Sequence, residues 1–222
     1  MTNANLDTVH LDVLPTQTKA AFLKCVELSF LGNEWYLAGG TALALQSGHR
    51  QSVDLDFFIQ AKTFNTSRMA EQFSEVGDWR TSSVSDGTLY GEFLGAKMSL
   101  IAYPSFIPAE AKLQVGMVGI LTPPDIAAMK VVAISQRGKK RDFIDLYWLC
   151  QNVLPLSECL ARAGKQYAVA QNGTHLLKSL VYFADADEDP EPVLFFKTTW
   201  KEVQDFFRRE VAAVTQHTVG LS

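Results

Sequence analysis

Residues 34–59 read EWYLAGGTALALQSGHRQSVDLDFFI, and this stretch decides the fold. Its apolar start has the composition of a strand, Gly39 and Gly40 interrupt that run, and residues 41–46 favour a helix. A glycine pair at a strand-to-helix junction lets a phosphate approach the N–H groups of the helix N-terminus. The same pair is also typical of a tight turn that needs positive φ. The stretch therefore predicts a strand, a glycine turn and a helix, with a candidate phosphate site at the turn.

Two aspartates interrupt the next apolar run, VDLDFFI at residues 53–59, which predicts a strand. Residues i and i+2 of a strand point to one side, so Asp54 and Asp56 are expected to project together. A divalent ion stabilises such a pair, and Mg²⁺ accepts a couple of carboxylates plus phosphate oxygens of a substrate. A solvated strand end that caps a turn is the alternative. A tight turn does not predict a nearby carboxylate pair, so the two features together favour a metal–nucleotide site.

The remainder of the chain divides into a β-rich part and a helical part. Residues 79–103 contain β-rich runs with a hairpin turn at Asp86-Gly87, and residues 115–121 (VGMVGIL) predict an edge strand. Helical patterns are expected at residues 15–31, 64–76, 126–135, 142–150, 157–170, 174–183 and 199–214. The acidic run at residues 185–192 is interpreted as a solvated connection. The fold class is therefore α+β, with an α/β core at residues 1–121 and a helical region at residues 122–222.

Length and composition limit the classes of protein that need consideration. A chain of 222 residues suffices for one sizeable core with a helical extension. The formal net charge of −4 argues against a wholly basic surface, so any nucleic-acid contact must be a local patch. Cys25, Cys150 and Cys159 lie in apolar helical patterns without metal-ligand spacing and are interpreted as packing residues. No run approaches the roughly 20 apolar residues of a membrane span, and residues 1–15 lack the pattern of an export signal. A cytoplasmic protein is expected.

Two stretches, LAGGTALALQSGHRQSVDLDFFI at residues 37–59 and DIAAMKVVAISQRGKKRDFIDLYWL at residues 125–149, carry a specific resemblance. They resemble the AbiEii/AbiGii-type toxins of the DNA polymerase β-like nucleotidyltransferase superfamily, over about residues 34–150. The resemblance implies a mixed sheet flanked by helices, with an active-site cleft that the C-terminal helical region completes. It also implies roles for individual residues. Gly39, Gly40 and Thr41 would bind the triphosphate, and Asp54 and Asp56 would bind Mg²⁺. Lys130 would contact the phosphates, with Asp142 and Asp145 near the site.

Three residues of the second stretch have alternative interpretations. A helical lysine is usually exposed, but the immediate neighbours of Lys130 are apolar, which favours a specific target for its ammonium group. Asp142 precedes Asp145 by three residues and so also imitates a helix-capping arrangement. By resemblance, one of these two aspartates helps to activate the acceptor hydroxyl. Both interpretations of Asp142 are compatible with one another.

Further candidate residues flank the two stretches. The run HRQSVDLDF matches the family's pattern through Ser52; Arg50 is suited to bidentate phosphate binding, whereas His49 is more typical of a structural hydrogen bond. One dense basic cluster comprises Arg137, Lys139, Lys140 and Arg141. It is interpreted either as a solvated loop or, preferably, as a seat for phosphates of RNA or a nucleotide.

The sequence departs from its relatives at one position. Many polymerase β-like transferases place a third carboxylate on a neighbouring strand, where it completes a two-metal site and helps to deprotonate the attacking hydroxyl. The matching strand here is AKMSLIAY, and the position of that acid is Ser99, which is neither a strong metal ligand nor a base at neutral pH. Glu92, on the preceding predicted strand, is a candidate substitute. This departure questions catalytic competence and leaves the fold prediction unaffected.

The leading hypothesis is Mg²⁺-dependent transfer of a nucleotide from an NTP to an acceptor. By resemblance, the acceptor is a tRNA end, and the protein is the toxin of a toxin–antitoxin pair with a cognate antitoxin. The alternatives are an NTP- and RNA-binding protein of weak activity, and a nucleotidyltransferase that acts on a small molecule. A haloacid-dehalogenase-like phosphatase is disfavoured, because its DxD lies on the first strand, whereas here a strand and Gly39-Gly40 precede the motif.

Overall fold

The computed structural model describes residues 6–32 and 34–219, which form two compact units, Met1–Thr122 and Pro123–Ser222. The sequence predicts this division between residues 121 and 122, one residue before the boundary that the structure shows. The expectation that there is no export signal concerns residues 1–15. Residues 1–5 of this stretch lie outside the described part of the chain. Among the residues that the structure describes, no helix combines the length and the apolarity needed to cross a membrane.

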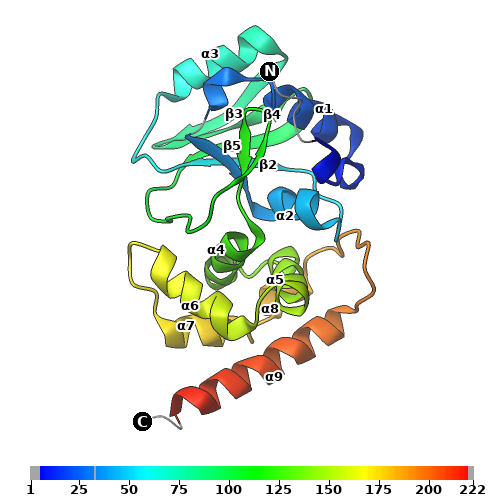
Figure 1. The fold of residues 1–222 in the computed structure, drawn as a ribbon, viewed down its shortest axis with the longest axis vertical. Helices are drawn as coiled ribbons and strands as arrows, with labels where there is room; N and C mark the ends of the chain where they lie inside the picture. Colours follow the sequence, from blue (N-terminus) through cyan, green and yellow to red (C-terminus); the bar gives the residue numbers. More distant parts are fainter. Residues whose placement is uncertain (1–5, 33, 220–222) are drawn as a thin grey trace. The chain divides into compact units, whose positions relative to one another are not determined.

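A seven-stranded mixed sheet forms the centre of the first unit (Figure 1). Its strands are β1 (Trp35–Ala38), β2 (Leu55–Ile59), β3 (Trp79–Ser85), β4 (Thr88–Phe93), β5 (Ala96–Ala102), β6 (Leu113–Val115) and β7 (Val118–Ile120). They lie in the order β3-β4-β5-β2-β1-β7-β6. The pairs β2–β5 and β1–β7 are parallel, and the others are antiparallel. The predicted α+β class with a mixed sheet is confirmed.

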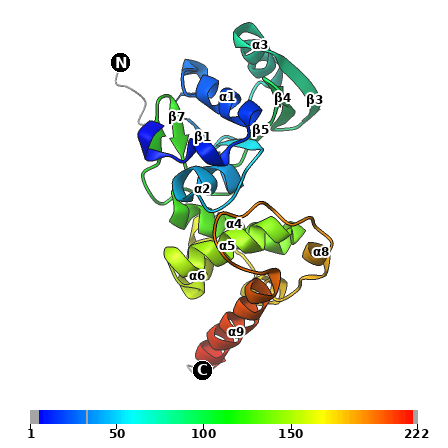
Figure 2. The ribbon, with the colours of Figure 1, turned by 90° about the vertical axis from the view of Figure 1, so that its right-hand side faces the viewer.

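Helices cover the sheet and connect its strands (Figures 1 and 2). They are α1 (Thr16–Cys25), α2 (Gly39–Ser47) and α3 (Thr66–Val76), with short 3-10 turns at Leu6–Thr8, Leu11–Val13 and Ser29–Leu31. α1 packs against β5 and α3 against β3 and β4. Alternate strand residues such as Phe57, Leu89 and Leu100 are completely or almost completely buried, whereas their sequence neighbours are more exposed. One face of the sheet therefore belongs to the core, and the other carries the polar residues described below.

The hairpin predicted at Asp86-Gly87 is confirmed, with Ser85 opposite Thr88 and Gly87 at φ +68°. The edge strand predicted at residues 115–121 is wrong. This run forms part of a β6–β7 hairpin in which β7 pairs with β1, so that β6 takes the edge. The turn needs Gly116, since its φ is +56° and a Cβ there would lie 2.3 Å from the Val26 carbonyl oxygen.

The second unit is helical, as predicted from residue 122 onward. It contains α4 (Pro123–Arg137), α5 (Lys140–Asn152), α6 (Leu156–Gln166), α7 (Gly173–Ser179), α8 (Ala184–Asp187) and α9 (Trp200–Val219). α4 packs against α5, α6 and α7, and α9 packs against α5. Phe143 lies at the centre of an aromatic cluster, with ring centroids 5.2 Å from Phe183, 5.8 Å from Trp200 and 5.5 Å from Phe207. This cluster joins α5 to α9.

The three cysteines are free thiols, with Cys25 and Cys159 buried and Cys150 half-buried. Burial raises the pKa of the Cys25 thiol above its usual range, which keeps it protonated and unreactive. Cys150 and Cys159 lie 3.8 Å apart, sulfur to sulfur. The interpretation of all three as packing residues agrees with these surroundings.

Candidate active site

The glycine turn begins α2 directly after β1. Gly39 has φ +71°, which L-residues rarely adopt, and a Cβ there would lie 3.2 Å from Asp56 Oδ2. Ala38 precedes the helix and offers no side-chain cap to its first N–H groups. The glycine therefore lets a carboxylate lie close to the positive end of a helix, where negative charge is stabilised.

Asp56 is positioned by the pairing of three strands. It lies opposite Ala38 of β1 and Ser99 of β5, and the Ser99 hydroxyl donates a hydrogen bond to Asp56 Oδ1. Asp56 is half-buried, so its carboxylate is held in place on one side and accessible on the other. The prediction that Ser99 occupies the position beside the carboxylate pair is confirmed.

Asp54 lies just before β2, which starts at Leu55, so the prediction that both aspartates belong to one strand is wrong. The reason is a tertiary contact: the Thr41 hydroxyl donates to the Asp54 carbonyl and draws the backbone of residue 54 toward α2. The Thr41 oxygen also lies 2.7 Å from Ser52 Oγ. Because Thr41 has one hydroxyl proton, Ser52 is the donor in that second bond. Thr41 and Ser52 thus hold the segment that carries Asp54.

Two further supports of this segment were missed by the sequence analysis. The Thr18 hydroxyl donates to the Val53 carbonyl at 2.9 Å, and the Ser52 N–H donates to the Val13 carbonyl at 3.2 Å. Both contacts join residues more than thirty positions apart in the chain. No local pattern signals such pairings, since they depend on how α1, which carries Thr18, and the 3-10 turn Leu11–Val13 are brought against this segment.

Arg50 and His49 are both buried, at 4% and 2% exposure. The Arg50 guanidinium donates to the Gln51 carbonyl at 2.8 Å, and His49 Nδ1 lies 2.7 Å from Ser47 Oγ. The structural interpretation of His49 agrees with this contact. Phosphate binding by Arg50 stays a prediction, as does triphosphate binding by Gly39, Gly40, Thr41 and Ser52.

The surroundings of Gly39 predict a clear effect of Gly39→Ala. Forcing a Cβ into the left-handed region costs about 1–2 kcal/mol, and the new methyl group would press on the Asp56 carboxylate. We expect urea unfolding to show that Gly39→Ala lowers the free energy of unfolding by that amount, and we expect its nucleotidyl-transfer activity to fall as well. Gly164→Ala in α6 is the matched control: a Cβ at Gly164 meets nothing within 4 Å, so alanine is expected to stabilise that helix by about 0.5–1 kcal/mol. Equal stability of the two variants would contradict the prediction.

The second unit holds the remaining predicted site residues, joined in a buried ion network. Lys130 Nζ lies 2.7 Å from Asp142 Oδ1 and 2.6 Å from Asp145 Oδ2, and the three side chains are at most 4% exposed. Arg137 binds the other side of Asp142 through Nε at 2.7 Å and Nη2 at 3.0 Å. Two cations thus face two carboxylates, and the network is electrically balanced.

This network bears on two interpretations. Lys130 is buried and has a specific target, as its apolar neighbours indicate, and in this network its ammonium group binds the two aspartates on α5. Asp142 does not act mainly as a cap, because both of its oxygens bind Lys130 and Arg137. Burial alone would raise the pKa of Asp142, but the adjacent Lys130 and Arg137 outweigh it and hold the pKa below 3.8. Phosphate contact by Lys130 and a catalytic role for Asp142 or Asp145 stay predictions.

The basic cluster at residues 137–141 contacts the acidic run at residues 185–192. Asp189 accepts hydrogen bonds from Lys139 Nζ at 3.0 Å and from the Lys140 backbone N–H at 2.9 Å. Glu191 binds Lys140 Nζ at 2.8 Å. Desolvation of Asp189 is offset by the Lys140 N–H and the Lys139 ammonium, which lower its pKa. The acidic run is largely exposed, as expected of a solvated connection, but Asp189 and Glu191 also bind Lys139 and Lys140 of the cluster. RNA phosphates would compete with these carboxylates.

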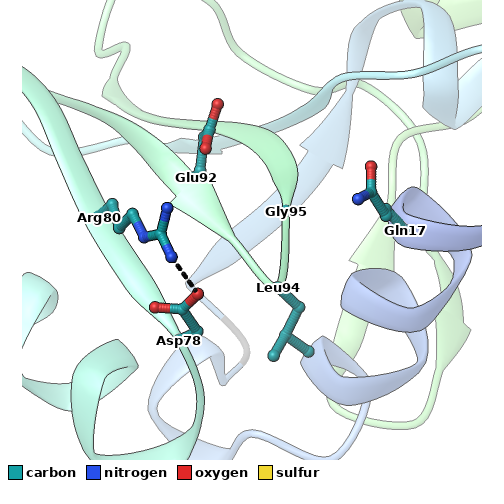
Figure 3. Close-up of a pocket in the computed structure, with 6 residues that line it drawn as sticks. All are labelled: Gln17, Asp78, Arg80, Glu92, Leu94 and Gly95. Carbon is teal, nitrogen blue, oxygen red and sulfur yellow. Dashed lines mark hydrogen bonds and ion pairs between the residues drawn. The ribbon is translucent and has the colours of Figure 1, made fainter.

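Glu92 does not substitute for the acid missing at Ser99. The β4 residue paired with Ser99 is Tyr90. Glu92 lies two positions farther along β4, where it is paired with Lys97 of β5 and Arg80 of β3. It lines a separate cavity of about 440 Å³ at the β4–β5 turn (Figure 3). The other lining residues are Gln17, Asp78, Arg80, Leu94 and Gly95. Arg80 binds Asp78 there at 3.2 Å.

The two carboxylates fit the way Mg²⁺ is usually held in proteins. Within the described residues, no group of three or more histidine, cysteine or acidic side chains could form an all-protein metal cage. Mg²⁺ typically binds one or two carboxylates together with substrate phosphates and water. Asp54 and Asp56, beside the start of α2, match that donor set. A nucleotide would have to supply the remaining oxygens.

Known proteins resemble this chain in sequence and in fold. Over 206 residues the chain is 37% identical to an uncharacterised protein of Aquifex aeolicus (strain VF5), covering 89% of this chain and 96% of the relative. The structure is similar to MenT4, a nucleotidyltransferase toxin from Mycobacterium tuberculosis H37Rv, with TM-score 0.54, 16% identity and coverage of 90% of this chain and 86% of that one. It is also similar to JHP933 from Helicobacter pylori, with TM-score 0.53, 18% identity and coverage of 94% and 97%.

The mixed seven-stranded sheet with its flanking helices defines a nucleotidyltransferase-fold protein. The sequence profile of the nucleotidyl transferase AbiEii toxins of type IV toxin–antitoxin systems matches residues 21–88 and 97–216. The chain belongs to this family, and the resemblance seen in its two motifs is confirmed.

Proposed function

We propose that this protein transfers a nucleotide from an NTP to the end of an RNA, with tRNA as the acceptor, and that it acts as a toxin controlled by a cognate antitoxin. The observation that carries the proposal is the position of the Asp56 carboxylate. One of its oxygens lies beside Gly39 at the N-terminus of α2, which has no side-chain cap, and the other accepts a hydrogen bond from Ser99. Family membership supports the reaction class and the toxin role. The RNA acceptor, the NTP and Mg²⁺ belong to the proposal.

In this mechanism, residues of the first unit bind and orient the triphosphate. The first N–H groups of α2 would bind phosphate oxygens, and Asp54 and Asp56 would hold Mg²⁺, whose charge would offset that of the phosphates. The acceptor hydroxyl oxygen forms a bond to the α-phosphorus, the bond to the pyrophosphate oxygen breaks, pyrophosphate leaves, and the hydroxyl proton passes to solvent water. Ser99 is no base, and the low pKa of Asp142 makes it a weak one. Positioning and charge stabilisation would therefore supply most of the rate.

The test is a labelling experiment with the purified full-length protein. It is incubated with Mg²⁺, one α-labelled NTP at a time, and total tRNA, beside an Asp54→Ala/Asp56→Ala variant. We expect label to become attached to RNA only when both aspartates are present, and the NTP that labels will identify the base. Label attached to RNA by the double variant would show that the chemistry does not depend on this site.

A second candidate function is binding of NTP and RNA without turnover. The specific observation in its favour is Ser99, which occupies the place of a third carboxylate and bonds to Asp56. This function predicts saturable NTP binding and no labelled product. Label on a small molecule in a cell extract, with none on RNA, would instead indicate a small-molecule nucleotidyltransferase.

A further inference from the structure

Tyr90 lies in the same row of the sheet as Asp56. The register runs from Asp56 on β2 to Ser99 on β5 and then to Tyr90 on β4. Directly paired residues project from the same face, and the hydrogen bond from Ser99 to Asp56 shows which face this is. Strands lie about 4.8 Å apart, so Tyr90 lies roughly 10 Å from Asp56 across two strand spacings.

The Tyr90 ring contributes little to the core. It is 43% exposed, whereas its neighbours along β4, Leu89 and Gly91, are buried on the opposite face. The residue opposite Tyr90 on β3 is Ser83, which is exposed, and the residue two positions along β5 from Ser99 is Lys97, also exposed. The Tyr90 ring thus lies on a face that carries the hydroxyl groups of Ser83 and Ser99 and the paired charges of Lys97 and Glu92, in line with the candidate metal ligand.

We propose that Tyr90 is a stacking platform for an unpaired base near the 3′ end of the acceptor RNA. This inference rests on the proposed function and adds a binding subsite to it. Aromatic side chains bind single strands by stacking on bases of any sequence, and sequence-tolerant contact suits an acceptor end. At about 3.4 Å for each stacked nucleotide, a base on Tyr90 belongs to a nucleotide about three positions from the reacting hydroxyl.

The direction of the bound RNA follows from the residues at the two ends of this row, Asp56 and Tyr90. The acceptor hydroxyl must reach the phosphate held at Asp56, and the bases before it then extend across Ser99 toward Tyr90. Lys97, on the same face, is suited to a backbone phosphate of this segment. A duplex would keep its bases stacked on each other and away from the ring, so the subsite selects an unpaired end.

The test compares Tyr90→Ala and Tyr90→Phe with a matched control. Val84→Ala removes an apolar side chain that is 56% exposed on the neighbouring β3, opposite Leu89 and therefore on the other face of the sheet. Loss of a stacking ring typically costs a factor of roughly ten or more in affinity. We expect Tyr90→Ala to raise the KM for tRNA about tenfold and to leave the KM for NTP unchanged, whereas Tyr90→Phe and Val84→Ala stay within about twofold of the parent.

A binding measurement separates this inference from the proposed function. Fluorescence anisotropy of end-labelled tRNA, without NTP, reports binding alone, and thermal unfolding checks that each variant is folded. Weaker binding by Tyr90→Ala supports the subsite even if the parent transfers no nucleotide, in which case only the proposed function fails. Equal binding by the parent and Tyr90→Ala, or no tRNA binding by the parent, overturns the subsite. A lower kcat with both KM values unchanged would also overturn it.

Discussion

Asp56→Asn is expected to lower the rate of nucleotidyl transfer by at least about 10³-fold, because a carboxylate that holds a catalytic metal contributes several kcal/mol to transition-state stabilisation. The asparagine side chain has the same shape and can still accept the hydrogen bond from Ser99, so the sheet is expected to remain intact. The loss should therefore come from charge. It is measured as kcat/KM for the labelled NTP with tRNA as the acceptor.

Two further variants show whether the effect is local. Asp86→Asn makes the same chemical change at the exposed hairpin turn and is expected to leave the rate unchanged. Ser99→Ala removes the hydroxyl that orients Asp56 and is expected to cost about 10-fold, less than loss of the carboxylate itself. If Asp56→Asn retained more than a tenth of the parent rate, Asp56 would not be the principal metal ligand.

Lys130→Met is expected to lower the free energy of unfolding by about 3–5 kcal/mol, because it leaves buried carboxylates without a shared cation. Asp142 and Asp145 have no exposed side-chain surface, and Lys130 binds an oxygen of each. Arg137 would still partner Asp142, which limits the loss at that carboxylate. Urea unfolding followed by circular dichroism measures the change. Methionine is close to lysine in length, which keeps any cavity small.

The control for this variant is Lys201→Met. Lys201 forms an ion pair with Asp205 on α9, but its side chain is 79% exposed, and such pairs contribute at most about 1 kcal/mol. The pH dependence gives a second check. Because the pKa of Asp142 is lower in the folded protein than the ordinary 3.8, its contribution is present above that value and is lost as the pH falls through the folded pKa. A Lys130→Met protein as stable as the parent would contradict the network's role.

Local patterns were sufficient for the main features of the first unit. Apolar strand residues followed by Gly39-Gly40 predict a strand, a turn and a helix, because glycine readily adopts the φ of +71° found there, which L-residues rarely do. Asp86-Gly87 between alternating runs predicts the β3–β4 hairpin. The two-residue period of strands also places Ser99 in line with Asp56, once the strands are matched to the family. The glycine turn and the hairpin depend on residues close together in the chain, whereas the match of Ser99 to Asp56 depends on the resemblance to the family.

Partners distant in the chain could not be read in this way. Apolar neighbours indicate that Lys130 has a target, but Asp142 and Asp145 become its partners only because α4 packs against α5. The acidic run looks solvated in isolation, and it binds Lys139 and Lys140 some fifty residues away.

The sequence thus determined the fold class, the glycine turn and the place of Asp56 on a strand, because backbone conformation and strand period are local properties. Tertiary packing decided that Asp54 precedes the strand and that Tyr90 stands in the row of Asp56. The physical reason is that a side chain's charge and exposure depend on which distant surfaces are brought against it.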